Sequence, residues 1–226
     1  MKVLDTGAGW VAAALMGAAA LCPAVSSAAM VSYYLDQTNV DQGSLVDGIN
    51  YAIVSIDDNT AGKITFTITP LSPLTSIAGT NFGLQTFDFN VSGTNPLHDS
   101  PSPEWTLPAN WTANVAPPPN QADGFGRFDA EVGDGGTSRA NPLVFQIDSS
   151  TGLTINSFPE LSSGSAAQGN VYFAAHISGF TDASGATSGY FGGSSLVPVP
   201  AAAWLLLSGL AGLGVTMRRT RDHLPA

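Results

Sequence analysis

The chain has 226 residues, of which 11% are charged, and its formal net charge at pH 7 is −10. Residues 29–196 contain 15 acidic residues but just three basic ones, Lys63, Arg127 and Arg139, which gives this segment a net charge of about −12. Because such a surface repels phosphate backbones, we expect no nucleic-acid partner.

Residues 1–28 are predicted to form a secretory signal peptide with a helical, apolar centre. Lys2 and the α-amine supply the positive start, and residues 8–22 (AGWVAAALMGAAALC) form an Ala-rich apolar stretch. Small residues follow, and they predict cleavage after Ala28, with Ala29 fitting nearly as well. Either cut removes the single cysteine, so the mature chain has no thiol and no disulfide.

The middle of the chain has the patterns of short β-strands. Residues 63–70 (KITFTITP) and 82–91 (FGLQTFDFNV) alternate apolar and polar side chains with the period of a half-buried strand. No amphipathic helical window of useful length lies between the strand signals. We therefore predict an all-β fold, an antiparallel β-sandwich or jelly-roll-like domain over residues 29–182. Further strands are expected at 31–40, 49–58, 126–132, 142–148, 152–158 and 171–178.

A proline-rich segment, residues 92–120, is predicted to be an ordered excursion from the sheets. It carries Trp105 and Trp111, the two tryptophans of the exported part. One interpretation is that both present exposed aromatic faces that stack on sugar rings. The other is that they cap the core beneath the proline-rich segment.

An acidic, glycine-rich stretch follows at 122–136 (ADGFGRFDAEVGDGG). Several carboxylates on a bendable loop could hold Ca²⁺, which prefers oxygen ligands. The spacing does not fit the EF-hand pattern, and two of the acids could be the polar face of a strand. The weak candidate ligands are Asp123, Asp129, Glu131 and Asp134. No other cofactor is expected.

Catalytic patterns are missing from the sequence. His98 and His176 do not have the partners or spacing of a zinc site, and no Gly-x-Ser-x-Gly motif occurs. We therefore predict that the protein is not an enzyme. A glycoside hydrolase would need two carboxylates facing each other across a cleft, about 5 to 10 Å apart, and sequence spacing singles out no such pair.

The chain ends in a predicted linker followed by a predicted membrane span. Residues 183–196 (ASGATSGYFGGSSL) read as a flexible linker. Residues 201–217 form an apolar run of about 25 Å if helical, close to the shortest length that crosses a bilayer. The basic residues after it place the following stub, 223–226, in the cytoplasm by the positive-inside rule. These are Arg218, Arg219 and Arg221.

Residues 197–222 (VPVPAAAWLLLSGLAGLGVTMRRTRD) resemble the PEP-CTERM sorting signal of Gram-negative bacteria. The resemblance rests on Pro198-Val199-Pro200, in which valine replaces the eponymous glutamate, on the Ala-rich entry with Trp204, on the Leu/Gly-rich span and on the arginines. It implies processing near the Pro-x-Pro by an exosortase-type membrane protease. It also implies association with exopolysaccharide and biofilm matrices.

These observations predict a protein exported through the inner membrane, anchored there transiently, and then placed at the cell surface or in the extracellular matrix. The expected role is structural or adhesive, with extracellular polysaccharide as a partner. One alternative is a carbohydrate-binding module that uses Trp105 and Trp111, which requires both side chains to be exposed on one face. A secreted hydrolase is the other alternative.

Overall fold

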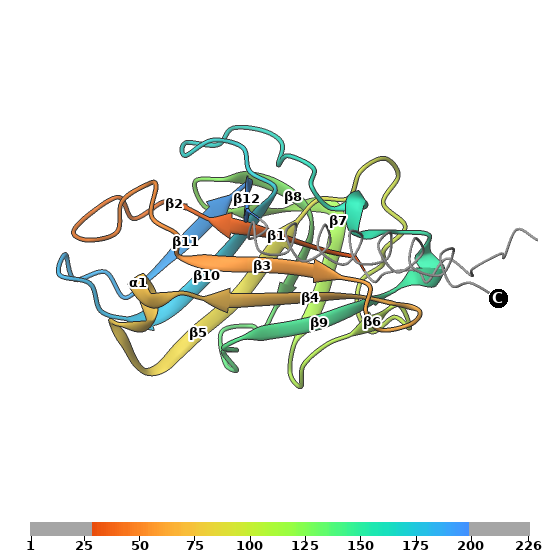
Figure 1. The fold of residues 1–226 in the computed structure, drawn as a ribbon, viewed down its shortest axis with the longest axis horizontal. Helices are drawn as coiled ribbons and strands as arrows, with labels where there is room; N and C mark the ends of the chain where they lie inside the picture. Colours follow the sequence, from red (N-terminus) through yellow and green to blue (C-terminus); the bar gives the residue numbers. More distant parts are fainter. Residues whose placement is uncertain (1–28, 199–226) are drawn as a thin grey trace, which may run out of the picture.

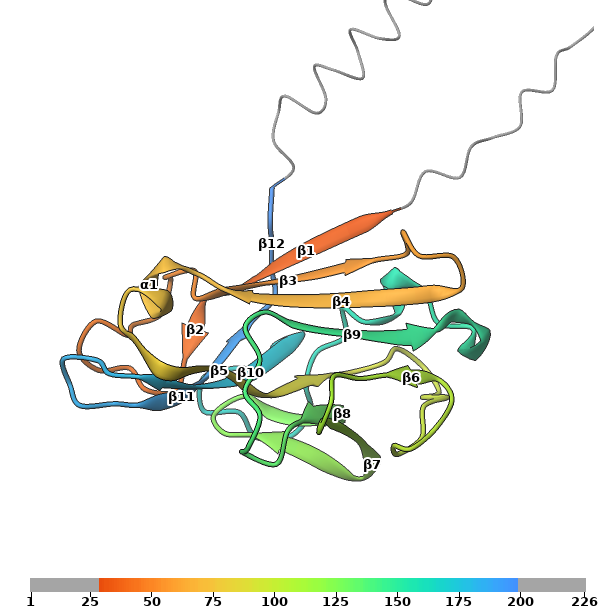
Figure 2. The ribbon, with the colours of Figure 1, turned by 90° about the horizontal axis from the view of Figure 1, so that it is seen from below.

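The computed structural model describes residues 29–198. The signal peptide, Trp204, the span 201–217 and the arginines that follow it lie outside the described residues. Within them the chain forms two six-stranded antiparallel sheets that face each other, as Figures 1 and 2 show. The prediction of an all-β domain built from antiparallel sheets is therefore confirmed.

Each sheet draws its strands from both halves of the described chain. The first sheet has the order β12 (Ser195–Leu196), β1 (Met30–Leu35), β3 (Ala52–Asp57), β4 (Lys63–Pro70), β9 (Leu143–Asp148) and β6 (Trp105–Thr106). The second has the order β2 (Gln37–Thr38), β11 (Ser188–Gly193), β10 (Phe173–Phe180), β5 (Ala78–Phe89), β8 (Gly126–Gly133) and β7 (Thr112–Ala122). The described helices are α1 (Ser72–Thr75) and the 3-10 turns η1 (Ser149–Thr151) and η2 (Ile155–Ser157).

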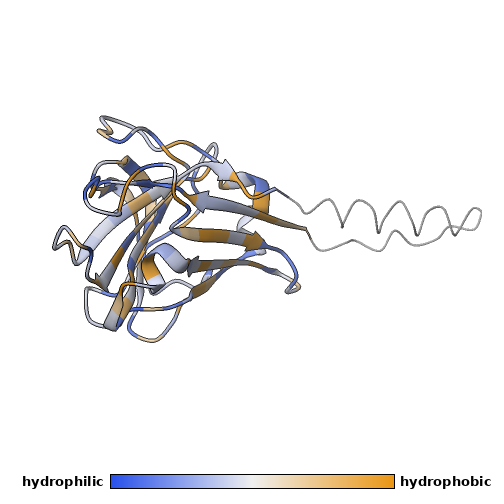
Figure 3. Ribbon diagram, turned by 60° about the vertical axis from the view of Figure 1, so that its left-hand side comes forward, coloured by the Kyte–Doolittle hydropathy of each residue, from blue (hydrophilic) through white to orange (hydrophobic). Residues whose placement is uncertain are grey.

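Alternation along the strands builds the core between the sheets. In β4, Ile64, Phe66 and Ile68 are buried, whereas the threonines between them are partly or fully exposed. Hydrophobic and hydrophilic residues are accordingly interleaved along the strands in Figure 3. The ring of Phe66 stacks on Phe145 with centroids 4.8 Å apart and meets Phe158 edge-on at the same distance. Phe66 also stacks on Phe89 of the facing sheet with centroids 5.3 Å apart, so aromatic packing links the two sheets.

The strand predicted at 152–158 is wrong. The 3-10 turn η2 lies within this segment instead, and the 3-10 turn η1 ends just before it. Asp148 caps η1 by accepting a hydrogen bond from Ser150 N, and Gly152 ends it in the left-handed region at φ 81°. The apolar residues of this segment therefore belong to a capped turn, and Phe158 packs in the core.

The flexible linker predicted at 183–196 is also wrong, and the domain extends beyond residue 182. β11 pairs with β10 over six residues, and Phe191 in its centre is fully buried. The glycines that indicated flexibility are required by packing, because a Cβ on Gly192 would lie 2.7 Å from the Phe125 ring. Glycine is used here for a close approach between backbone and aromatic ring.

The proline-rich excursion is more regular than predicted, since it contains β6 and the start of the eleven-residue strand β7. β7 pairs with β8 on both sides of an irregularity between Val115 and Asn120. Among residues 29–198, no helix combines the length and hydropathy needed to cross a membrane. The predicted span 201–217 falls outside that range.

The first and last strands of the described chain pair with each other at one edge of the first sheet. Tyr33 is opposite Leu196, and Val197 N donates a hydrogen bond of 2.9 Å to Ser32 O. β12 runs antiparallel to β1, and its end lies beside the middle of β1. The chain therefore enters and leaves the domain along the same edge of the first sheet (Figure 2).

Candidate functional site

The two predicted sugar-stacking residues are buried. Trp105 is 9% exposed and Trp111 is 6% exposed, and both belong to the core cluster. Their indole N–H groups donate to backbone carbonyls, Trp105 to His98 O and Trp111 to Ser138 O, each at 2.8 Å. The interpretation that both present free faces to a sugar is therefore wrong. They instead form part of the wall of a cavity of about 460 Å³, with two prolines and Leu107.

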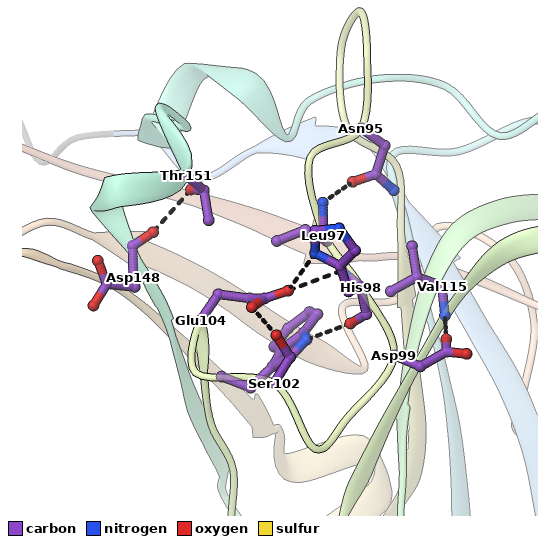
Figure 4. A network of polar contacts seen from close by, with 10 residues as sticks. Asn95, Leu97, His98, Asp99, Ser102, Glu104, Val115, Asp148 and Thr151 are labelled. Atoms are coloured by element: carbon purple, nitrogen blue, oxygen red, sulfur yellow. Dashed lines mark hydrogen bonds and ion pairs between the residues drawn. The ribbon is translucent and has the colours of Figure 1, made fainter.

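A buried carboxylate organises the loop beside Trp105 (Figure 4). Glu104 accepts hydrogen bonds from His98 N at 2.9 Å, from the His98 ring at 3.0 Å and from the Ser102 hydroxyl. Burial raises the pKa of Glu104, but the hydrogen bonds from Ser102 and His98 outweigh it and leave the pKa below its usual value. The Ser102 hydroxyl is bound by Glu104 and not by His98, so this cluster lacks the serine–histidine contact of an activated nucleophile.

The four candidate calcium ligands do not converge. Asp123 is exposed and accepts from Asn39 Nδ2 at 3.1 Å, whereas Asp129 accepts from Val91 N at 3.1 Å. Asp134 is buried, and its carboxylate accepts from the backbone N–H groups of two following residues. Glu131 lies apart, on the outer face of β8. Within residues 29–198, no three His, Cys, Asp or Glu side chains gather in a way that could hold a metal ion. The predicted calcium cluster is therefore wrong for these residues.

A polar pocket lies on the outer face of the second sheet, away from the core. It has a volume of about 310 Å³, within the range of small-molecule sites. β5, β7, β8 and β10 supply its walls, and the loop after β8 adds two glycines. Its hydrogen-bonding side chains are Gln85, Thr86, Thr112, Asn114, Glu131 and His176.

A fully buried carboxyl group lies next to this pocket. Asp88 on β5 is directly opposite Glu131 on β8, and its side chain is 0% exposed. Its Oδ2 accepts from Thr86 Oγ1 at 3.5 Å, and its Oδ1 has no hydrogen-bond partner. Burial, and secondly the charge of Glu131, raise the pKa of Asp88 well above its usual value. Burial of Asp88 therefore favours its protonated form, and burial also raises the pKa of the neighbouring Glu131, which the hydrogen bond from Asn114 partly offsets.

Two aromatic side chains border the same face. The ring of His176 stacks on Tyr190 with centroids 4.7 Å apart and planes at 18°. Burial, and then the positive charge of Arg139, lower the pKa of His176, so its imidazole is neutral at pH 7. Burial raises the pKa of Tyr190 to about 12, so its hydroxyl stays protonated. The pocket thus presents a neutral imidazole and one carboxylate.

The pockets of the described residues do not supply the carboxylate pair of a glycoside hydrolase. The polar pocket is lined by Glu131 alone among the acids, because Asp88 is fully buried. A second, smaller pocket brings together Glu104 and Asp148, but hydrogen bonds hold the pKa of both below the usual value. Burial raises the pKa of Glu131, but among the residues that line its pocket no second carboxylate faces it, whereas the reaction requires an accessible pair.

Sequence reasoning missed Asp88 because alternation placed it on the wet face of a half-buried strand. In the structure a second, smaller apolar cluster covers the neighbouring outer face of the sheet. It consists of Ala122, Phe125, Phe128, Val171 and Ala174, with Tyr190 packed against it.

Comparisons of the chain with known protein families, with curated proteins and with solved structures gave no match.

Proposed function

We propose that this protein is exported across the inner membrane, held there by residues 197–222, and cut near Pro198 by an exosortase-type protease. The product is a structural or adhesive component of the cell surface or of the extracellular polysaccharide matrix. The domain that reaches the surface is, in this proposal, a β-sandwich. The sorting signal itself lies almost entirely outside the described residues.

The observation that carries the proposal is the shared sheet edge at which the chain enters and leaves the domain. Pro198 directly follows Val197, whose N–H donates to Ser32 O, and Ala29 lies three residues before Ser32. A signal peptide and a C-terminal anchor insert into the same membrane, and chain ends that lie on one edge of the domain are compatible with that arrangement.

A contact of Ala29 favours cleavage after Ala28 over cleavage one residue later. Ala29 N donates to Asp58 Oδ1 at 2.6 Å. Hydrolysis after Ala28 breaks the peptide C–N bond and turns this amide nitrogen into an α-ammonium group, which keeps the same acceptor and adds the opposite charge. A cut after Ala29 removes the contact.

The mass of the protein in the surface and culture fractions tests the proposal. We expect a chain that starts at Ala29 and ends near Pro198. The double variant Pro198→Ala, Pro200→Ala should stay in the membrane fraction at full length, because the processing motif is lost. A matched control, Pro96→Ala, changes a proline in the exported loop and should be processed normally. Full-length protein that retains Arg218 to Arg221 in the culture fraction would refute the proposed processing.

A further inference from the structure

Glu131 differs from most of the other well-packed carboxylates of the domain. Asp129, Asp134 and Asp182 each accept at least one hydrogen bond from a backbone N–H, at 2.5 to 3.2 Å. These three carboxylates therefore hold loops and strand ends in place. Glu131 accepts one contact, from Asn114 Nδ2 at 3.5 Å, the upper limit for a hydrogen bond. The fold makes little use of this carboxylate, although it is partly buried in the wall of a pocket.

The groups around Glu131 have unused hydrogen-bonding atoms as well. Gln85 Oε1 accepts from Ser178 at 2.7 Å, but among the described residues its Nε2 makes no hydrogen bond. The ring nitrogens of His176 likewise have no partner in residues 29–198, while the ring is held in place on Tyr190. Asn114 is exposed and offers both a donor and an acceptor. The pocket thus presents donors and acceptors together, which is what a hydroxyl group needs.

A second pocket extends this surface along β5 and β10. It has a volume of about 420 Å³ and shares Gln85 with the polar pocket that contains Glu131. Asn81, Ser178 and Thr187 line it with polar groups, and the Arg139 guanidinium donates to Asn81 O. Two neighbouring polar pockets that share a residue suit successive units of a chain better than a single small molecule.

The charges of the two pockets and of the surrounding domain limit which kind of polymer can bind. Glu131 and Arg139 contribute one charge of each sign to the two pockets, and His176 is neutral. The surrounding domain carries a net charge of about −12, which repels polyanions. An uncharged ligand is not repelled by this net charge.

From this geometry we propose that the two adjoining pockets, centred on Gln85 and Glu131, bind an uncharged, hydroxyl-rich chain, namely a segment of a neutral polysaccharide. Glu131 and Asn114 are binding residues in this site, and the tryptophans play no part in it. The inference rests on the proposed function for the source of the polysaccharide, a surface matrix. Binding itself needs neither export nor processing.

Isothermal titration of the purified full-length chain tests the site, in a detergent whose headgroup is not a sugar. The probes are neutral gluco-, manno-, galacto- and xylo-configured tetrasaccharides and, as the anionic arm, a tetragalacturonate. We expect at least one neutral probe to bind and the anionic probe not to bind. Glu131→Gln and Asn114→Ala should each weaken binding about tenfold, the loss expected for one hydrogen bond to a charged or well-placed group. Glu160→Gln makes the same charge change at an exposed position and should bind like the parent.

Three results would overturn the inference: no neutral probe binds at millimolar concentration, binding survives both pocket variants, or tetragalacturonate binds as well as the neutral chains. Asn114 is exposed on the edge strand β7, so Asn114→Ala keeps the test decisive even if a change at Glu131 disturbs folding. Thermal unfolding of each variant separates the two effects. A failure to bind leaves the masses of the processed chain unaffected, so it is distinct from a failure of the proposed function.

Discussion

Replacing Asp88 by Asn removes a buried carboxyl whose pKa burial raises in the folded protein. The side chain is fully buried, its Oδ1 has no hydrogen-bond partner, and its pKa lies well above the usual value. In the unfolded chain the pKa is about 3.9. Between these two pKa values the folded state binds more protons than the unfolded state, so the free energy of unfolding falls as the pH rises. Asp88 therefore makes the protein less stable at neutral pH than in mild acid.

The size of the effect follows from the environment of the side chain. An amide is neutral at every pH, so Asp88→Asn removes the cost of keeping a titratable group in this position. That cost, at neutral pH, is about 1.4 kcal/mol for each pH unit between the folded and unfolded pKa values. We expect a gain of about that size at pH 7, which for a domain of this length corresponds to roughly 2–4 °C in Tm per kcal/mol. Below about pH 4 the gain should disappear, because Asp88 is then protonated in both states.

Thermal unfolding of the parent and of Asp88→Asn, measured at pH 4 and at pH 7.5, provides the assay. Asp182→Asn is the matched control of opposite sign. Hydrogen bonds from Ser44 and Ser184 lower the pKa of Asp182, so its contribution is present at neutral pH and is lost as the pH falls. An Asp88→Asn protein that is less stable than the parent at pH 7.5, or equally stabilised at both pH values, would refute the reasoning.

Three further changes test the packing and the processing. Phe66→Ala removes a ring that contacts four other phenylalanines and should lower the free energy of unfolding by about 3–5 kcal/mol in urea denaturation. Gly192→Ala places a methyl group 2.7 Å from the Phe125 ring and should cost about 1–3 kcal/mol in the same assay. An unchanged free energy of unfolding would contradict this. A flexible Gly-Ser insertion between Leu196 and Val197 should speed processing near Pro198, measured by pulse-chase, because it moves the motif away from the sheet edge. Unchanged or slower cleavage would contradict this.

Much of the fold could be predicted from local patterns, because each strand with one buried face carries a period of two. β4 and β9 are clear examples, with a buried phenylalanine at the centre of each. The same rule failed at β11, where glycines replace the alternating polar residues. Its sequence, SGYFGG, lacks a binary pattern, because Phe125 and the backbone of β1 fill the space that side chains would occupy. A glycine needed for close packing and a glycine in a flexible linker look the same in a sequence.

The tryptophans show why exposure is harder to predict than strand position. Both lie in a segment with the composition of a surface loop, and both were compatible with stacking on sugars. What buries them is a set of distant partners: Trp105 packs against Phe89 and Phe145, and Trp111 donates to Ser138 O across 27 residues. The residues next to each tryptophan in the sequence do not indicate these distant partners.

The polar pocket was beyond sequence reasoning for a related reason. Asp129 and Glu131 are two residues apart on one strand and face the same way, so alternation assigns them the same role. The fold separates them, since Val91 N reaches Asp129 from 38 positions away, whereas Glu131 meets the buried Asp88 and an exposed amide. The Asp129 carboxylate is used in a hydrogen bond that holds the fold, whereas the Glu131 carboxylate stays available to a ligand. That difference arises from the pairing of β5, β7, β8 and β10, which no motif in the sequence of β8 indicates.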